Sequence, residues 1–285
     1  MIAAGLVLLA LGLADLARQA VHRHRWVALA AVLIVVLALG VVVDAVPAAA
    51  MALAVTTGWV WLMPVGAPAR AGVWPAVAVF GLATASVAWI APRSEPGLIG
   101  PVWRMPVPGG ELTPDHAVLV IGAAVFLLES ANVVVRAALG THALPARTGG
   151  ARAPRSAEPR HPPPATDGFV IPPRPPLPGA PARDEPPEPE GGSADDAVPL
   201  PERPSLKGGR LIGPLERILV FALTLAGAYA LLAAALAAKG IVRFPEISRD
   251  DAGDRAEYFL VGSLVSWVLA LASAFLVWWG FGLAR

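Results

Sequence analysis

Residues 116–138 read HAVLVIGAAVFLLESANVVVRAA, and this stretch decides the class of protein to which the chain belongs. A bilayer has a hydrocarbon core about 30 Å thick, which roughly 20 apolar residues cross as an α-helix. The stretch is long enough, and its only charged residues after His116 are Glu129 and Arg136. We therefore expect a transmembrane helix here, with its few polar side chains facing other parts of the protein.

The composition of the whole chain agrees with a membrane protein and excludes several other classes. Of the 285 residues, 56% are hydrophobic and 15% are charged, and the mean hydropathy of +0.62 is too high for a water-exposed surface. The formal charge is only +1, and no basic stripe alternates with aromatic residues, so nucleic acid is not an expected partner. The absence of cysteine excludes disulfides, thiolate metal sites and cysteine nucleophiles.

The same length criterion identifies seven candidate spans, so we predict an all-α, polytopic membrane protein with about seven transmembrane helices. We expect the first span to be a retained helix, because no small-x-small cleavage site followed by a soluble domain is seen. The spans cover residues 2–17, 26–43, 46–63, 72–91, 116–138, 212–238 and 257–281.

Residues 140–207 interrupt this pattern and predict a long disordered linker. Of the 30 prolines in the chain, 18 lie within residues 140–209, with very little apolar surface to bury, so ordering this segment would cost more than it gains. The linker would join a five-helix unit, 1–139, to a two-helix hairpin, 208–285. Its segment 171–178, IPPRPPLP, favours polyproline II and is either part of a spacer or a ligand for a proline-binding groove of another membrane or cytoplasmic protein.

Basic residues predict the orientation of the chain, because cytoplasmic loops retain lysine and arginine. An N-terminus outside, with the linker and the C-terminus in the cytoplasm, places 16 basic residues inside and six outside. Arginine, alanine, glycine and proline are abundant, as in chains from GC-rich bacteria, so we expect the bacterial inner membrane. The six residues placed outside are Arg93, Arg104, Lys239, Arg243, Arg249 and Arg255.

Glu129, Asn132 and Arg136 form the candidate intramembrane polar site. Their spacing places all three on one helix face, and an ionisable group inside a bilayer is costly unless it is partnered. One interpretation is a protonatable or ion-binding carboxyl on a transport path. The other is a hydrogen-bonded carboxyl that fixes helix packing.

The last two spans carry small residues at every fourth position, which predicts close packing of the two helices in an antiparallel hairpin. Charged side chains gather at their ends, where complementarity with the helix dipoles would explain them and a ligand site is the alternative. Because span 212–238 is read as one straight helix, these charges are expected at two opposite membrane faces. The small residues are Ala222, Ala226, Ala230 and Ala234, then Gly262, Ser266, Ala270 and Ala274; the charged residues are Arg210, Glu216, Arg217, Lys239, Arg243, Glu246 and Glu257.

Three separated blocks near the C-terminus, at 209–217 (GRLIGPLER), 237–244 (AAKGIVRF) and 256–264 (AEYFLVGSL), resemble a C-terminal region of uncharacterised bacterial multi-pass inner-membrane proteins. The resemblance covers about 60 of the 285 residues. It implies a membrane hairpin and carries no assigned activity. In such proteins a helix near the N-terminus ends with an Asp and a Gln, to which Asp15 and Gln19 would correspond.

The sequence contains no nucleophile–base pair, no metal-ligand spacing and no phosphate-binding motif, so we predict no catalytic, cofactor or metal site. Two functions remain. The first is a non-enzymatic membrane scaffold or partner-binding protein, because charges at helix ends need only structural roles. The second is a transporter or channel for protons or a small solute that uses Glu129.

Overall fold

The computed structural model describes residues 1–21, 24–64, 71–90, 97–98, 103, 105–107, 110–142, 209–247 and 254–283, and these residues form nine helices and one short β-ladder. Strands β1 (Met105–Val107) and β2 (Gly110–Leu112) pair antiparallel. The predicted all-helical class is confirmed for the body of the fold. The helices are α1 (Ile2–Ala20), α2 (Arg25–Val42), α3 (Val46–Leu62), α4 (Trp74–Trp89), α5 (Pro114–Leu128), α6 (Ser130–His142), α7 (Gly209–Leu225), α8 (Tyr229–Ile247) and α9 (Asp254–Leu283).

The helices before and after the linker pack into one compact unit, Met1–Leu144 together with Lys207–Arg285. The other unit is Pro145–Leu206, which covers most of the predicted linker 140–207 and lies outside the described residues, whereas residues 140–142 belong to the end of α6. Helices α5 and α6 both contact α9, and α5 also contacts α7. The five-helix unit and the C-terminal helices predicted from the sequence thus share one core.

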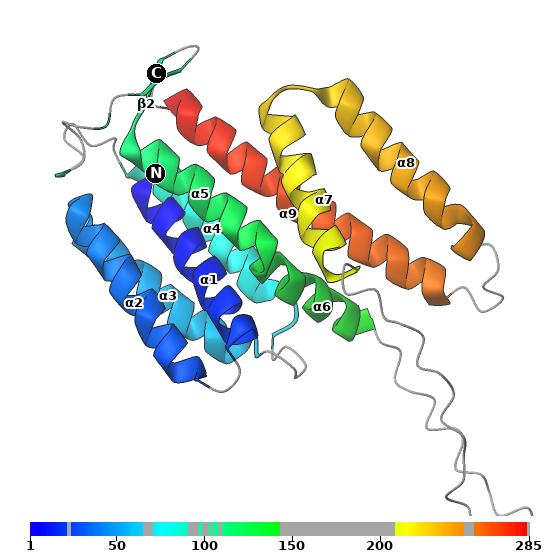
Figure 1. Cartoon of the computed structure of the whole chain (residues 1–285), viewed down its shortest axis with the longest axis horizontal. Coiled ribbons are helices and arrows are strands. Elements are labelled where there is room, and N and C mark those ends of the chain that lie inside the picture. Colours follow the sequence, from blue (N-terminus) through cyan, green and yellow to red (C-terminus); the bar gives the residue numbers. More distant parts are fainter. Residues whose placement is uncertain are drawn as a thin grey trace, which may run out of the picture. The chain divides into compact units, whose positions relative to one another are not determined.

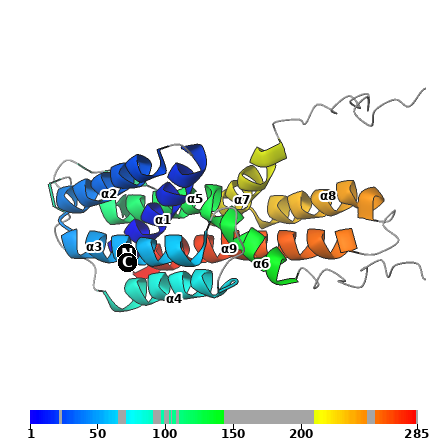
Figure 2. The ribbon, with the colours of Figure 1, turned by 90° about the horizontal axis from the view of Figure 1, so that it is seen from below.

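Helix α1 lies at the centre of this core. It packs against α2, α3, α4 and most extensively α5, and its residues are buried almost all round, as expected for an internal apolar helix (Figures 1 and 2). Glycines allow the close approach of α1 to α5. A Cβ on Gly5 would lie 2.7 Å from the Leu119 backbone nitrogen, and one on Gly12 would lie 2.7 Å from the Val125 backbone carbon. Residue numbers increase in the same direction on both helices from the first contact to the second, so α1 and α5 run parallel.

The predicted span 116–138 is not one straight helix. It breaks at Glu129 into α5 and α6, which are bent by 45°. A bend of this size needs a local cause, and it coincides with the buried Glu129 and with an arginine side chain that bonds to the backbone beside it.

The prediction of a single helix over 212–238 is wrong. Helix α7 ends in a turn at residues 226–228, where Gly227 has a φ of +67°. The Ala228 nitrogen donates to the Leu223 carbonyl at 2.9 Å, and the Gly227 nitrogen donates to the Thr224 carbonyl at 3.1 Å. This is a Schellman cap, which ends a helix at a glycine in the left-handed conformation. The chain then reverses, and α8 runs back beside α7 (Figure 1).

The start of α1 and the end of α9 lie at the same end of the helical body. A Cβ on Gly280 would lie 3.5 Å from the Met1 sulfur, and the rings of His116 and Phe281 are 4.2 Å apart between centroids. Seven straight spans would place these ends at opposite sides, and the reversal at Gly227 accounts for the difference. Which end faces the cytoplasm stays a prediction.

Two described helices are long and apolar enough to cross a membrane, Ile2–Ala20 and Ala256–Gly282, and α5 with α6 would make a third if the bent pair is one span. The other apolar helices are shorter than a full span. The number of seven transmembrane helices therefore stays a prediction. These shorter helices are Trp26–Val42, Val46–Leu62, Trp74–Trp89 and Tyr229–Val242.

Candidate functional site

The structure brings together the three residues of the predicted intramembrane polar site. Glu129 occupies the α5–α6 bend and is 6% exposed. The Asn132 amide nitrogen donates to its Oε2 at 3.1 Å, and Arg136 Nη2 lies 3.8 Å from its Oε1. The side chain of Arg136 is 54% exposed, so it extends from the buried carboxylate to the surface.

Arg217 of α7 joins this group from the other side. It is 3% exposed, and its guanidinium donates to three acceptors: Ser266 Oγ at 2.8 Å, the Leu127 carbonyl at 3.0 Å and Asn132 Oδ1. A planar guanidinium with five N–H donors suits such a site, because it can bind acceptors on several helices at once. The Leu127 carbonyl lies beside the helix break.

These contacts form one connected polar network, which we name the Arg217 network: Ser266, Arg217, Asn132, Glu129 and Arg136. It links α9, α7 and the α5–α6 bend across sequence separations of 49 and 85 residues. Buried polar groups in such a network hold their helices in place when each has a partner and destabilise them when one partner is removed.

Space for the guanidinium comes from a glycine one turn earlier in α7. A Cβ on Gly213 would lie 3.3 Å from Arg217 Nη2 and 3.8 Å from Asn132 Oδ1. A side chain at position 213 would therefore require the Arg217 guanidinium to shift by a few tenths of an ångström. Gly213 and Arg217 therefore act together, although only Arg217 has a polar role.

A second charge pair holds α8 against the body. Glu216 forms an ion pair with Lys239, whose ammonium nitrogen lies 5.8 Å from the Phe259 ring centroid and 5.7 Å from that of Trp267. In one straight helix, residues 216 and 239 would be about 35 Å apart. The reversal between α7 and α8 brings them together instead.

The predicted hairpin charge cluster is thus rearranged. Glu216 and Lys239 were expected at opposite membrane faces and are in contact, whereas Arg217 belongs to the Arg217 network. Glu257 is exposed in the first part of α9 and lines a small recess with Leu139. The side chains of three further members, Arg210, Arg243 and Glu246, lie outside the described residues.

The predicted small-residue seam between the last two spans is not present. On α9, Ser266, Ala270 and Ala274 are buried, but the nearest side chains to Gly262 are Val135 and Leu139 of α6, each 3.8 Å from an added Cβ. The seam predicted on the other span is exposed. Its members are Ala222, Ala226, Ala230 and Ala234.

The structure contains a second buried acid, which was expected only through the family resemblance and not as a polar site. Asp15 of α1 is 0% exposed, accepts from Trp59 Nε1 at 3.0 Å and pairs with Arg18. Arg18 also donates to the Met63 carbonyl at 3.1 Å, at the end of α3. A cation there satisfies the last carbonyls of the helix. The sequence signal that could have predicted this group is the pair Asp15 and Arg18, three residues apart on one helix face. Gln19 is half-buried and does not belong to this group.

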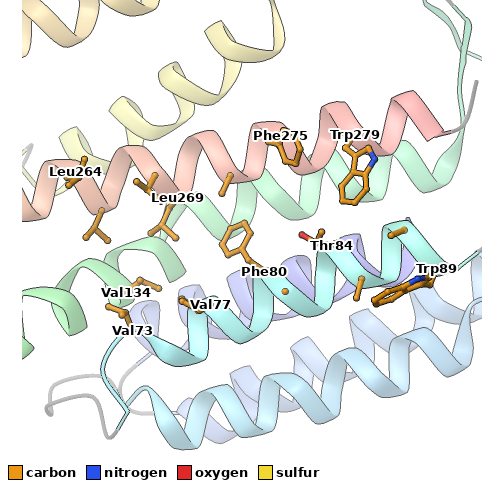
Figure 3. Close-up of a pocket in the computed structure, with 17 residues that line it drawn as sticks. Val73, Val77, Phe80, Thr84, Trp89, Val134, Leu264, Leu269, Phe275 and Trp279 are labelled. Atoms are coloured by element: carbon orange, nitrogen blue, oxygen red, sulfur yellow. The ribbon is translucent and has the colours of Figure 1, made fainter.

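An apolar groove of about 830 Å³ lies between α4 and α9 (Figure 3). Phe80 and Trp279 line it from opposite helices, Val134 of α6 borders one end, and Trp89 lies at the other. Among the described residues that line it, Thr84 carries the one hydroxyl group, and Trp89 and Trp279 add indole N–H groups. A groove of this kind can hold lipid chains or an apolar helix, but offers no group for acid–base chemistry.

Within the described part of the chain, no cluster of three or more His, Asp or Glu side chains could hold a metal ion. His116 has a structural role there, because its ring contacts Thr113 Oγ1 at 2.7 Å in the N-terminal cap of α5. No protein-family model, curated protein or solved structure matches the chain.

Proposed function

We propose that this chain is a multi-pass protein of the bacterial inner membrane that acts as a non-enzymatic scaffold and binds a protein partner. The observation that carries the proposal is the Arg217 network. Its buried guanidinium is directed onto groups of the protein itself, on three separate helices, rather than into an open site. This buried charge thus serves helix assembly.

The outer surface supports the same function. Large apolar side chains are exposed along α2, α4, α8 and α9, which suits helices surrounded by lipid or by another membrane protein. The proline-rich linker adds a long segment that favours the extended polyproline II conformation. It would therefore lose little conformational entropy when a partner binds it. A rigid helical body that carries such a segment is suited to hold a partner at the membrane.

The test is a purification from native membranes in mild detergent, with two matched proteins. One is the full chain, and the other has residues 145–206 replaced by a Gly/Ser linker of equal length. We expect a stoichiometric partner with the full chain and an unchanged melting temperature for both proteins. Loss of the partner with the replaced linker would assign binding to that segment, and retention would assign it to the helical body. A full chain that purifies without any partner contradicts the proposal.

The second candidate is a transporter or channel for protons or a small solute. It is favoured by one observation: Glu129 contacts the half-exposed Arg136, so the buried carboxylate is one side chain away from the surface. A carboxyl near a membrane centre that can exchange a proton is a usual element of proton pathways.

Proton flux in liposomes separates the two candidates. Glu129→Gln keeps an acceptor for the Asn132 amide but cannot ionise, so it should fold as the wild type does. If the protein conducts protons, wild-type flux should disappear in Glu129→Gln at unchanged melting temperature. If the protein is a scaffold, wild-type and variant liposomes should both show only background flux, and partner binding should be the same for both proteins.

A further inference from the structure

We infer that α7 and α8 enter the membrane and return to the face from which they came, so that the end of α8 and the start of α9 face the same side as the end of α6, where the linker begins, and the end of α9 faces the same side as Met1. This inference rests on the membrane location proposed above. It places the Glu216–Lys239 ion pair at the headgroup level of the leaflet on that side.

The path of the chain supports this topology. Helix α6 ends and α7 begins at the two ends of the linker, at the same end of the body (Figure 1). The Schellman cap at Gly227 turns the chain back, and the Glu216–Lys239 ion pair fixes the far part of α8 beside the start of α7. The segment that follows α8 therefore begins on the linker side.

The lengths of the last three helices agree with the same topology. Helix α7 has 17 residues and the apolar part of α8 runs from Tyr229 to Val242, so the two are about 25 Å and 21 Å long. Both are shorter than the hydrocarbon core of about 30 Å. The apolar part of α9 has 27 residues, or about 40 Å, which is enough to cross with some tilt. Two short helices that return and one long helix that crosses fit these lengths.

The distribution of basic residues also agrees with this topology. A straight 212–238 span puts 16 basic residues on the linker side and six on the other. The returning path moves Lys239, Arg243, Arg249 and Arg255 to the linker side and Arg285 away from it, which gives 19 against three. Basic residues accumulate on the cytoplasmic side of membrane proteins, so the path seen in the structure satisfies this rule better than the straight span does.

The surroundings of Lys239 agree with a position at the headgroup level. Its ammonium group lies over Phe259 and Trp267 and pairs with Glu216, and its side chain is 19% exposed. Aromatic rings beside a lysine are typical of the membrane–water interface, where the apolar stem lies in lipid and the charged group reaches water.

The chain has no cysteine, so single-cysteine variants can map its orientation directly. We would make Ser193→Cys in the linker, Ser248→Cys between α8 and α9, and Gly282→Cys at the end of α9, where an added Cβ meets no atom within 4 Å. Each is treated with a membrane-impermeant maleimide in spheroplasts and in inverted vesicles. Gly58→Cys on α3, also open to its surroundings, is the control for a thiol within the lipid.

We expect Ser193→Cys and Ser248→Cys to be labelled in inverted vesicles only, and Gly282→Cys in spheroplasts only. Labelling of Ser193→Cys and Ser248→Cys from opposite faces would overturn the inference and restore a straight span. Labelling of Gly282→Cys from the same face as Ser193→Cys would overturn it as well. Recovery of the wild type in the soluble fraction would instead overturn the membrane location on which the proposed function rests.

Discussion

Arg217 shows how one buried side chain can hold four helical segments together. Its three acceptors belong to α9, to α5 and to α6, and its own helix is α7. Removing one partner from a buried charged network costs more free energy than the intact network contributes, because the remaining polar groups stay desolvated.

The variant Arg217→Met should therefore lower the free energy of unfolding by about 3–5 kcal/mol, since the Leu127 carbonyl, Asn132 and Ser266 each lose a donor. Arg217→Lys should recover part of the loss, because it keeps the charge but cannot reach three acceptors. Thermal unfolding in detergent measures both. Glu257→Gln, at an exposed position in the first part of α9 and outside the network, is the control and should change the free energy of unfolding by less than about 0.5 kcal/mol. Equal melting temperatures for Arg217→Met and wild type would show that the network has no stabilising role.

At the scale of elements, the contact of α1 with α5 depends on glycine. Gly5→Ala should force the two helices apart and cost about 1–3 kcal/mol, because the new Cβ would lie 2.7 Å from the Leu119 backbone nitrogen. Gly58→Ala in α3 is the matched control. No atom lies within 4 Å of its new Cβ, so a helix-favouring alanine should leave stability unchanged or improve it by roughly 0.5–1 kcal/mol. The ranking of the two melting temperatures is the decisive result.

The turn between α7 and α8 permits an equally direct test. Gly227 has open space around it but a φ of +67°, so Gly227→Ala tests backbone conformation alone and should cost about 1–2 kcal/mol. Gly240→Ala, inside α8 with open space and no positive φ, should stabilise the protein by roughly 0.5–1 kcal/mol. If both variants shift the melting temperature in the same direction, the left-handed turn at Gly227 is not required.

At the scale of the whole molecule, the contacts of α5 and α6 with α7 and α9 should hold the protein together without the linker. Protease treatment of the purified protein should cut rapidly between residues 145 and 206, because proline-rich segments with little apolar surface do not fold. The two fragments should then co-elute in gel filtration. Separation of the fragments after cleavage would mean that the linker, rather than the packed helices, maintains the assembly.

The sequence alone determined the helical class and the local part of the polar site. Apolar runs of about 20 residues predict helices because the backbone must be satisfied within each segment. Glu129, Asn132 and Arg136 could be grouped because a helix repeats every 3.6 residues, and all three lie within two turns. The Asp15–Arg18 pair follows the same rule, because its two residues lie one turn apart on one helix. The hydrogen bond from Trp59 of α3 to Asp15 could not be predicted in this way.

Only the tertiary structure decided which distant groups meet. Arg217 joins Asn132 across 85 residues, and no local rule distinguishes this arginine from one that faces the headgroups. Hydropathy also failed at residues 226–228, because an average over about 20 residues measures how apolar a segment is and not in which direction the chain runs. A single glycine in the left-handed conformation reversed the path there. That reversal brought Lys239 to Glu216 and the end of α9 to Met1.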